Sequence, residues 1–269
     1  MREGLPQDHG LAKEILSIPA LVPSTEGTPL LTDIQYEALA HGVARGESVI
    51  VSAPTSTGKT LIGLWAIAAS ILTQRRAVYL VSHRALAHQK FGELLSVFGR
   101  TILEDHSTLV IATGDGVEDA LGRRISNPLH SGVLVATYEK FLHSLAVGGP
   151  PRDLSDVCLV CDEIQLIGDQ QRASNVELLL TLLKRAQWNQ FVGLSAVLSP
   201  RDAEELSSWL GVVRKACKDD LGSDRQYGDM QGIDVLDVPR TGTRDIVVDN
   251  EGLCGDHIAG ANCSNRVAT

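Results

Sequence analysis

The stretch Ala53-Pro54-Thr55-Ser56-Thr57-Gly58-Lys59-Thr60 decides the fold of this chain. It follows an apolar, strand-like run at residues 48–52 and opens a helix-like run at residues 61–67. A strand that enters a tight loop ending in Gly-Lys-Thr is the sequence form of a phosphate-binding P-loop. Successive backbone N–H groups and the following helix N-terminus would then point at one place, where a triphosphate can be held.

Three residues of this loop bear on what it can bind. Lys59 would neutralise the outer phosphates, and the hydroxyl of Thr60 would bind Mg²⁺. Ala53 stands where the strict pattern has glycine. The alternative is a helix entry that is merely rich in small residues, because a bare pattern also arises by chance. The flanking strand and helix favour nucleotide binding.

Composition limits the classes of protein that this chain can belong to. A length of 269 residues allows one large or two small domains with a sizeable core. The 43% hydrophobic and 21% charged residues are typical of an ordinary globular protein. No apolar run is long enough to span a membrane, and no signal peptide follows Met1. We therefore expect no membrane partner and a cytoplasmic location.

The cysteines and the net charge argue against two further classes. Five cysteines without a paired spacing predict neither a disulfide framework nor a zinc site. Cys158 and Cys161 form a Cys-x-x-Cys pair, but they lie in an apolar strand whose alternation would bury both. The net charge of −9 provides no global basic field for nucleic acid. A local phosphate-binding groove remains compatible with an acidic protein, because only the potential of the groove itself matters.

Strands and helices alternate along the chain. The predicted strands are residues 48–52, 77–82, 109–113, 132–136, 156–162 and 190–195. The predicted helices are residues 59–73, 84–98, 138–146, 175–186 and 200–210. This alternation predicts an α/β fold with a parallel sheet covered by helices on both faces. Ligands of such sheets bind at the carboxyl ends of the strands, where the P-loop also lies.

The two ends of the chain do not follow this pattern. Residues 1–30 contain four prolines and a short helix candidate at 11–18, and we interpret them as an amino-terminal arm. Within residues 213–269, the stretch 219–269 is rich in Gly and Asp and has one short strand candidate at 245–248. We expect an irregular tail there, which is either disordered or the product of a shifted reading frame.

Two adjacent carboxylates, Asp162 and Glu163, end the strand at residues 156–162. Asp162 can hold Mg²⁺ through water, and Glu163 can polarise the water that attacks the γ-phosphate. The alternative is a pair of solvated charges that simply ends a strand. A P-loop about a hundred residues earlier favours the catalytic interpretation.

The ordered motifs of this chain resemble those of the superfamily 2 DExD/H-box helicases, and within them the Ski-type branch. The resemblance covers residues 31–210, and we place a RecA-like helicase ATP-binding domain at residues 31–212. Leu31-Thr32-Asp33-Ile34-Gln35 is similar to the motif that recognises adenine, with Gln35 as the contacting residue. Residues 53–60 are similar to motif I, where Ala commonly replaces the first Gly. Asp162-Glu163-Ile164-Gln165 is similar to motif II, with Gln165 where the branch often has His.

Further motifs of this family contact nucleic acid or couple hydrolysis to its movement. His83-Arg84-Ala85-Leu86-Ala87 resembles motif Ia, Thr113-Gly114-Asp115 resembles motif Ib, and Ala136-Thr137-Tyr138-Glu139-Lys140 resembles the following strand-contact motif. The resemblance implies that a single strand of DNA or RNA is gripped by Arg84, Thr113, Gly114, Thr137 and Lys140. From the residues alone, Thr113-Gly114-Asp115 could equally be an ordinary turn and Thr137 a helix cap.

Gly193-Leu194-Ser195-Ala196-Val197 resembles motif III, where Ser-Ala-Thr is usual. The resemblance implies that Ser195 and Ala196, together with Gln165 of motif II, couple hydrolysis to strand movement. Val197 lacks the hydroxyl of the usual threonine, so this coupling is the role that departs most from the family pattern.

Family members of this kind need a second RecA-like lobe, which supplies arginine fingers. No segment after residue 210 resembles such a lobe, so we expect the chain to require one in cis or in trans. We expect the isolated chain to bind Mg-ATP and to hydrolyse it slowly, because an arginine finger contributes on the order of 10³–10⁵ in turnover. Two alternatives remain open: an ATP-regulated binding module without unwinding activity, and a different P-loop motor such as a restriction translocase.

Overall fold

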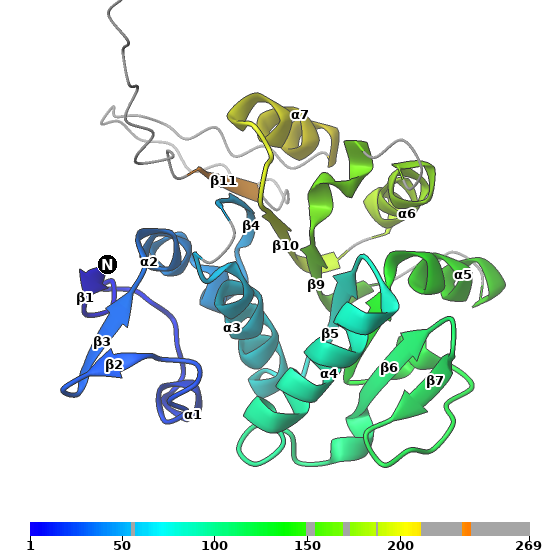
Figure 1. Cartoon of the computed structure of the whole chain (residues 1–269), viewed down its shortest axis with the longest axis horizontal. Helices are drawn as coiled ribbons and strands as arrows, with labels where there is room; N and C mark the ends of the chain where they lie inside the picture. Colours follow the sequence, from blue (N-terminus) through cyan, green and yellow to red (C-terminus); the bar gives the residue numbers. More distant parts are fainter. Residues whose placement is uncertain (55–56, 149–153, 169–172, 187, 211–232, 238–269) are drawn as a thin grey trace, which may run out of the picture. The chain divides into compact units, whose positions relative to one another are not determined.

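A sheet of eight strands runs through the described residues, in the order β11-β4-β10-β9-β5-β8-β6-β7 (Figure 1). The structure is a computed structural model that describes residues 1–54, 57–148, 154–168, 173–186, 188–210 and 233–237. The strands of this sheet are β4 (Ser48–Ser52), β5 (Arg76–Val81), β6 (Leu109–Thr113), β7 (Gly116–Asp119), β8 (Val133–Thr137), β9 (Leu154–Asp162), β10 (Trp188–Ser195) and β11 (Ile233–Asp237).

The sheet is parallel except at one edge. Every neighbouring pair is parallel apart from β6 and β7, which are antiparallel. All five residues of β4, β6 and β8 are buried, and apolar, β-branched residues dominate these strands. Strands buried on both faces need such continuous apolar sequence, because neither face meets water. The prediction of a parallel sheet is confirmed, and all six predicted strands are present with ends within two residues of those expected.

Helices cover both faces of the sheet. One hydrophobic cluster joins the sheet to α2 (Asp33–Ala40), α3 (Lys59–Leu72) and α4 (Arg84–Phe98). A second cluster joins the opposite face to α5 (Tyr138–Gly148), α6 (Ala173–Arg185) and α7 (Pro200–Leu210). Five of these helices match the prediction to within two residues. Helix α2, which is only eight residues long, is not among the predicted helices.

Helix α3 approaches the sheet closely enough to require a glycine. A Cβ built on Gly63 would lie 2.9 Å from Cγ1 of Val160 and 3.3 Å from the ring of Tyr79. A contact of 2.9 Å is shorter than van der Waals packing allows, so a larger residue would push α3 away from β9. The P-loop is thereby held close to the strand that ends in Asp162.

The first thirty residues, which we interpret as an amino-terminal arm, contain a short helix and short strands. They contain β1 (Arg2–Glu3), α1 (Lys13–Leu16), β2 (Ser24–Thr25) and β3 (Thr28–Leu31), and the three strands form a small antiparallel sheet in the order β1-β3-β2. Ile15 and Leu21 are fully buried in the cluster that contains α3. The indole Nε1 of Trp65 donates a hydrogen bond of 2.8 Å to the backbone oxygen of Leu21. These residues therefore stabilise the helix that follows the P-loop.

One described strand, β11, comes from the carboxyl-terminal part of the chain. Strand β11 lies within the segment expected to be irregular, and it pairs in parallel with β4. The strand candidate at 245–248 lies outside the described residues. The domain boundary at residue 212 stays a prediction.

The two cysteines of the Cys-x-x-Cys pair are buried and free, as the alternation of the strand predicts. Cys158 belongs to one hydrophobic cluster and Cys161 to the other, so they lie on opposite faces of β9. Burial raises the pKa of the Cys158 thiol to about 12. Among the described residues, no helix combines the length and the apolar character that crossing a membrane requires.

Candidate nucleotide site and nucleic-acid edge

Three strands bring the P-loop and the acidic pair to one edge of the sheet. Ser195 of β10 pairs with Ser52 of β4, and Leu194 pairs with Asp162 of β9. The carboxyl ends of β4, β10 and β9 are therefore level, with β10 between the other two. Ala53 and Glu163, which follow two of these ends, lie at the same edge although 110 positions separate them in the chain.

The P-loop turns through a glycine that no other residue could replace without strain. Gly58 has φ +82°, in the left-handed region, and a Cβ there would lie 2.1 Å from Nε2 of Gln35. The loop is closed by a hydrogen bond of 2.8 Å from the Thr57 hydroxyl to the backbone oxygen of Pro54. Thr55 and Ser56, which we predict to contact phosphate, lie outside the described residues.

Lys59 is bound to the loop that precedes it. Its Nζ donates hydrogen bonds of 2.5 Å to the backbone oxygen of Ala53 and 2.7 Å to that of Pro54. Burial lowers the pKa of Lys59, and the nearby negative charge of Asp162 acts in the opposite direction. A phosphate oxygen would replace these carbonyl contacts with a charge-assisted one, which is stronger.

Asp162 is held from both sides by buried groups. The hydroxyl of Tyr79 donates a hydrogen bond of 2.9 Å to its Oδ2, and the backbone N–H of Glu163 donates one of 3.0 Å to its Oδ1. The hydroxyl of Tyr138 donates 2.8 Å to the backbone oxygen of the same aspartate. Burial raises the pKa of Asp162, while the Tyr79 hydrogen bond and the charge of Lys90 oppose that shift. A carboxylate fixed in this way has a defined orientation before any ligand binds.

Glu163 follows at a backbone angle that is rare for its type. Its φ is +56°, in the left-handed region, although it is not a glycine. Such a conformation costs on the order of 1–3 kcal/mol and is found preferentially at functional sites. The turn is closed by a hydrogen bond of 3.0 Å from the Leu166 N–H to the Glu163 backbone oxygen.

The oxygen donors at this edge suit Mg²⁺ bound together with a nucleotide. Thr60 contributes a hydroxyl and Asp162 a carboxylate, and both are hard oxygen ligands of the kind that Mg²⁺ prefers. Among the described residues, no group of three or more His, Cys, Asp or Glu side chains could hold a metal ion by itself. A metal here would therefore take phosphates and water as its remaining ligands, as Mg²⁺ usually does.

Gln35, which we predict to contact adenine, joins α2 to the P-loop. Its Oε1 accepts a hydrogen bond of 2.9 Å from the backbone N–H of Thr32. The backbone N–H of Gln35 in turn donates one of 3.3 Å to the Thr32 hydroxyl. This is a capping box, which satisfies the N-terminus of α2. Its Nε2 donates 3.1 Å to the backbone oxygen of Gly58. Gln35 is therefore placed beside the loop by its helix cap, and its amide is already hydrogen-bonded on both sides.

The predicted coupling residue Ser195 connects β10 to the P-loop. The Ala53 N–H donates 3.1 Å to the backbone oxygen of Ser195, and the Ser195 hydroxyl accepts from the N–H groups of Val197 and Leu198 at 3.3 Å and 3.0 Å. The Ser52 hydroxyl donates 2.5 Å to the Leu198 backbone oxygen. The motif III turn and the P-loop are thus joined directly, with half-buried Ala196 inside that turn.

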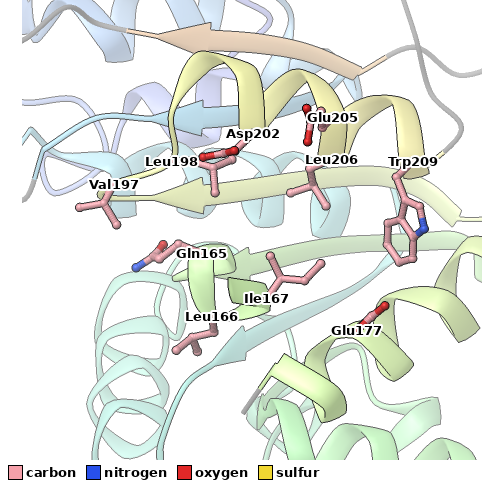
Figure 2. Close-up of a pocket in the computed structure, with 10 residues that line it drawn as sticks. All are labelled: Gln165, Leu166, Ile167, Glu177, Val197, Leu198, Asp202, Glu205, Leu206 and Trp209. Atoms are coloured by element: carbon pink, nitrogen blue, oxygen red, sulfur yellow. The ribbon is translucent and has the colours of Figure 1, made fainter. Parts of the chain in front are cut away.

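Gln165 and Val197 line one pocket of about 790 Å³ outside this turn (Figure 2). Figure 2 shows Gln165, Leu166 and Ile167 on one side of the pocket and residues of α7 on the other, with Trp209 at one end. Val197 is 63% exposed, so the departure from the usual threonine lies at the surface. Of the predicted coupling residues, Gln165 therefore lines this pocket, and the acidic side chains Glu177, Asp202 and Glu205 also line it.

The predicted nucleic-acid residues follow the next three strands of the sheet, β5, β8 and β6. Val81 pairs with Thr137, and Ala112 pairs with Ala136, so these strand ends are level as well. The structure therefore brings the five predicted contact residues to one continuous edge, beside the nucleotide site. Their individual surroundings differ.

Arg84 and Asp115 form an exposed ion pair across two motifs. Nη1 of Arg84 lies 2.5 Å from Oδ1 of Asp115, and the side chains are 62% and 57% exposed. A Cβ built on Gly114 would lie 3.7 Å from Cδ of Arg84, so motifs Ia and Ib are in contact. Thr113 is buried, and its hydroxyl accepts a hydrogen bond of 3.2 Å from the Asp115 N–H. Arg84 is the accessible cation of this group.

Thr137 and Lys140 lie at the start of α5. Thr137 is buried, and its hydroxyl accepts a hydrogen bond of 3.3 Å from the Lys140 N–H, as a helix cap does. In this structure Thr137 thus makes the contact of a helix cap, which is one of the two interpretations of this residue from the sequence. Direct binding of nucleic acid by Thr113 and Thr137 stays a prediction.

Two residues near Asp162 are missing from the sequence prediction. Tyr79 lies inside an apolar strand, so the sequence indicates only a residue of the hydrophobic core. Lys90 is buried on the same face of α4 as Ala87 and Leu94. A lysine on the apolar face of an amphipathic helix is an anomaly that could have identified it.

Comparisons with known proteins agree on the family and the fold. Residues 32–206 match the family described as DEAD/DEAH box helicase. The chain is 39% identical over 181 residues to the ATP-dependent DNA helicase Hel308 of Pyrococcus abyssi, and 36% identical over 187 residues to that of Aeropyrum pernix. These alignments cover 65% and 69% of this chain but only 23% of each relative.

Solved structures add the fold. The DEAD-box helicase Mss116 bound to ssRNA and UDP-BeF has a TM-score of 0.56 at 18% identity, covering 77% of this chain and 41% of that one. A hypothetical ATP-dependent RNA helicase from Sulfolobus tokodaii has a TM-score of 0.52 at 15% identity, covering 74% and 54%. The predicted RecA-like helicase fold is therefore confirmed for this part of the chain.

Proposed function

Since this chain belongs to the DEAD/DEAH box helicase family, we propose that it is the ATP-binding motor lobe of a nucleic-acid helicase. The observation that carries the proposal is the register of β4, β10 and β9, which brings the P-loop and the acidic pair Asp162–Glu163 to one edge. ATP and Mg²⁺ are the ligands that this arrangement suits.

Each residue of the nucleotide site has a distinct part in this proposal. The P-loop backbone from Ala53 to Thr60 surrounds the phosphates, and Lys59 exchanges its carbonyl contacts for the outer phosphates. Thr60 and Asp162 hold the metal, which neutralises the charge that develops on the phosphates when bound. Glu163 orients and polarises the attacking water. Gln35 reaches the adenine from the side of the loop.

The adjacent edge formed by β5, β8 and β6 is the proposed binding surface for a single strand. Arg84 is the exposed cation, Lys140 lies at the start of the neighbouring helix, and Gly114 allows close approach of a phosphate. Such contacts bind the sugar–phosphate backbone without reading sequence. The Hel308 relatives are named DNA helicases, so single-stranded DNA is the first substrate to test.

Unwinding requires a further part. The chain corresponds to less than a quarter of the length of the Hel308 relatives, and we propose that a second RecA-like lobe, in cis or in trans, completes the catalytic site. Without the arginine finger of such a lobe, turnover falls by on the order of 10³–10⁵. We therefore expect slow hydrolysis by the isolated chain.

Nucleotide binding by the Lys59→Ala variant tests the proposal directly. Affinity for a fluorescent ATP analogue in the presence of Mg²⁺ should fall at least about ten-fold, because a charge-assisted contact to phosphate is lost. Lys13→Ala, which removes an exposed lysine on α1, is the matched control and should leave the affinity unchanged. Undiminished affinity in Lys59→Ala would contradict the proposal.

The ATPase rate with and without single-stranded DNA or RNA separates the motor from the alternative binding module. Strong stimulation by a single strand supports the motor lobe. A flat, low rate with retained binding of nucleic acid supports the module instead. Including both polymers in the assay also decides which of them the edge prefers.

A further inference from the structure

A buried lysine lies where the metal end of the proposed nucleotide site is expected. The side chain of Lys90 on α4 is only 6% exposed. Its Nζ donates a hydrogen bond of 3.2 Å to the hydroxyl of Thr60 and one of 2.9 Å to Oε2 of Glu93. Isolated buried ammonium groups are costly, so the surroundings must supply negative charge or polar contacts.

Those surroundings connect the two proposed metal ligands. The Lys90 ammonium lies 5.8 Å from the centroid of the Tyr79 ring, within the range of a cation–π contact. The Tyr79 hydroxyl in turn donates 2.9 Å to Oδ2 of Asp162. The positive charge of Lys90 acts on that carboxylate and favours its ionised form. Lys90 thus contacts Thr60 directly and reaches Asp162 through Tyr79.

We propose that, without bound nucleotide, the ammonium of Lys90 supplies the positive charge next to the proposed metal ligands Thr60 and Asp162. We further propose that this charge opposes the binding of a free divalent cation. This inference rests on the proposed function, because it concerns the ligands Thr60 and Asp162. An ammonium that contacts Thr60 and acts electrostatically on Asp162 repels a divalent cation in a partly buried site. The polyphosphate of a nucleotide offsets that repulsion, so the metal enters together with its nucleotide.

A purely structural role is the competing explanation for Lys90. Lys90 lies on the buried face of α4 with Ala87 and Leu94, and its pair with Glu93 is local, at a spacing of three residues. Under that explanation the charge satisfies Glu93 and has no effect on metal binding. The contact with Thr60 distinguishes the two explanations, because a local pair does not require it.

Binding of Mn²⁺ alone to the full chain, followed by electron paramagnetic resonance without nucleotide, tests the proposal. Lys90→Met keeps the volume of the stem and removes the charge, and it should raise the affinity for Mn²⁺ by about ten-fold or more. Lys90→Arg keeps the charge and should retain the weak affinity of the native chain. Circular dichroism confirms that each variant is folded, and Lys90→Gln replaces Lys90→Met if the latter is not.

Three results would overturn the proposal: equal Mn²⁺ affinity in the native chain and the folded neutral variant, weaker affinity in that variant, or a gain in Lys90→Arg as large as in Lys90→Met. Binding of the Mn²⁺ complex of a non-hydrolysable ATP analogue is measured in parallel. If the native chain binds that complex but the neutral variant shows no gain for Mn²⁺ alone, only the role of Lys90 fails. If the native chain does not bind the complex at all, the proposed function fails as well.

Discussion

The two halves of the sheet's carboxyl edge are built differently. Around β4, β10 and β9, the backbone and buried side chains are joined to one another, as in the bonds from Ala53 to Ser195 and from Ser52 to Leu198. At the predicted contact residues after β5, β8 and β6, the polar contacts are short-range caps and turns, with one exposed ion pair between Arg84 and Asp115. The difference suggests a fixed site for chemistry beside a surface that can accept a flexible polymer.

The two halves of the edge also differ in the free energy of their polar contacts. Buried polar groups that are linked to each other orient a reacting group before the ligand arrives, which lowers the cost of reaching the transition state. An exposed ion pair contributes between about 0 and 1 kcal/mol, so Arg84 can exchange Asp115 for a phosphate at little cost. We expect substitutions in the first half to change chemistry and those in the second half to change binding of nucleic acid.

The largest expected effect belongs to Glu163→Gln. ATP turnover stimulated by a single strand should fall by about 10²–10⁴, because the general base is lost. The amide has the shape of the carboxylate, so affinity for Mg-ATP should stay within a factor of about two of the native value. Steady-state ATPase and nucleotide titration measure the two quantities. Glu204→Gln, on the exposed side of α7, is the control and should change neither.

A smaller effect is expected from Arg84→Ala. Affinity for single-stranded DNA should fall several-fold at low salt. A plot of the logarithm of this affinity against the logarithm of the salt concentration should become less steep by about one unit, because one phosphate contact is lost. Asp115→Asn should act in the opposite direction, because it frees Arg84 from its carboxylate. Fluorescence anisotropy over a range of salt measures both. An equal loss of nucleotide affinity in Arg84→Ala would break the distinction between the two halves.

The smallest effect concerns the opposite, amino-terminal edge, where Arg76 of β5 binds Asp156 of β9. Nε and Nη2 of Arg76 contact the two carboxylate oxygens at 2.7 Å and 2.5 Å, and this lowers the pKa of Asp156. A carboxyl whose pKa is lower in the folded state stabilises the fold at pH values above its unfolded pKa of about 4. This stability is lost as the pH falls through the folded pKa. Asp156→Asn should therefore reduce the free energy of unfolding by at most about 1 kcal/mol at pH 7.

Urea unfolding of the native chain and Asp156→Asn at several pH values measures that difference. The difference should begin to shrink as the pH falls below about 4, and neither nucleotide binding nor nucleic-acid binding should change at pH 7. A difference that grows as the pH falls would have the wrong sign and would exclude the proposed contribution of the pair.

The sequence alone determined six of the eight described strands of the large sheet, five of the helices that cover it, and the position of the P-loop. Those features are local, because a buried parallel strand needs a continuous apolar run and a phosphate loop needs Gly58 and Lys59 between a strand and a helix. The acidic pair was recognisable for the same reason, since Asp162 and Glu163 end such a run.

Only the tertiary structure decided which distant residues meet. The strand order places β10 between the P-loop strand and the acidic strand, brings Tyr79 to Asp162, and sets Lys90 against Thr60. It also packs Leu21 against Trp65, which makes the first thirty residues part of the fold. None of these contacts has a local signature, because each depends on how elements separated by tens of residues are arranged in space.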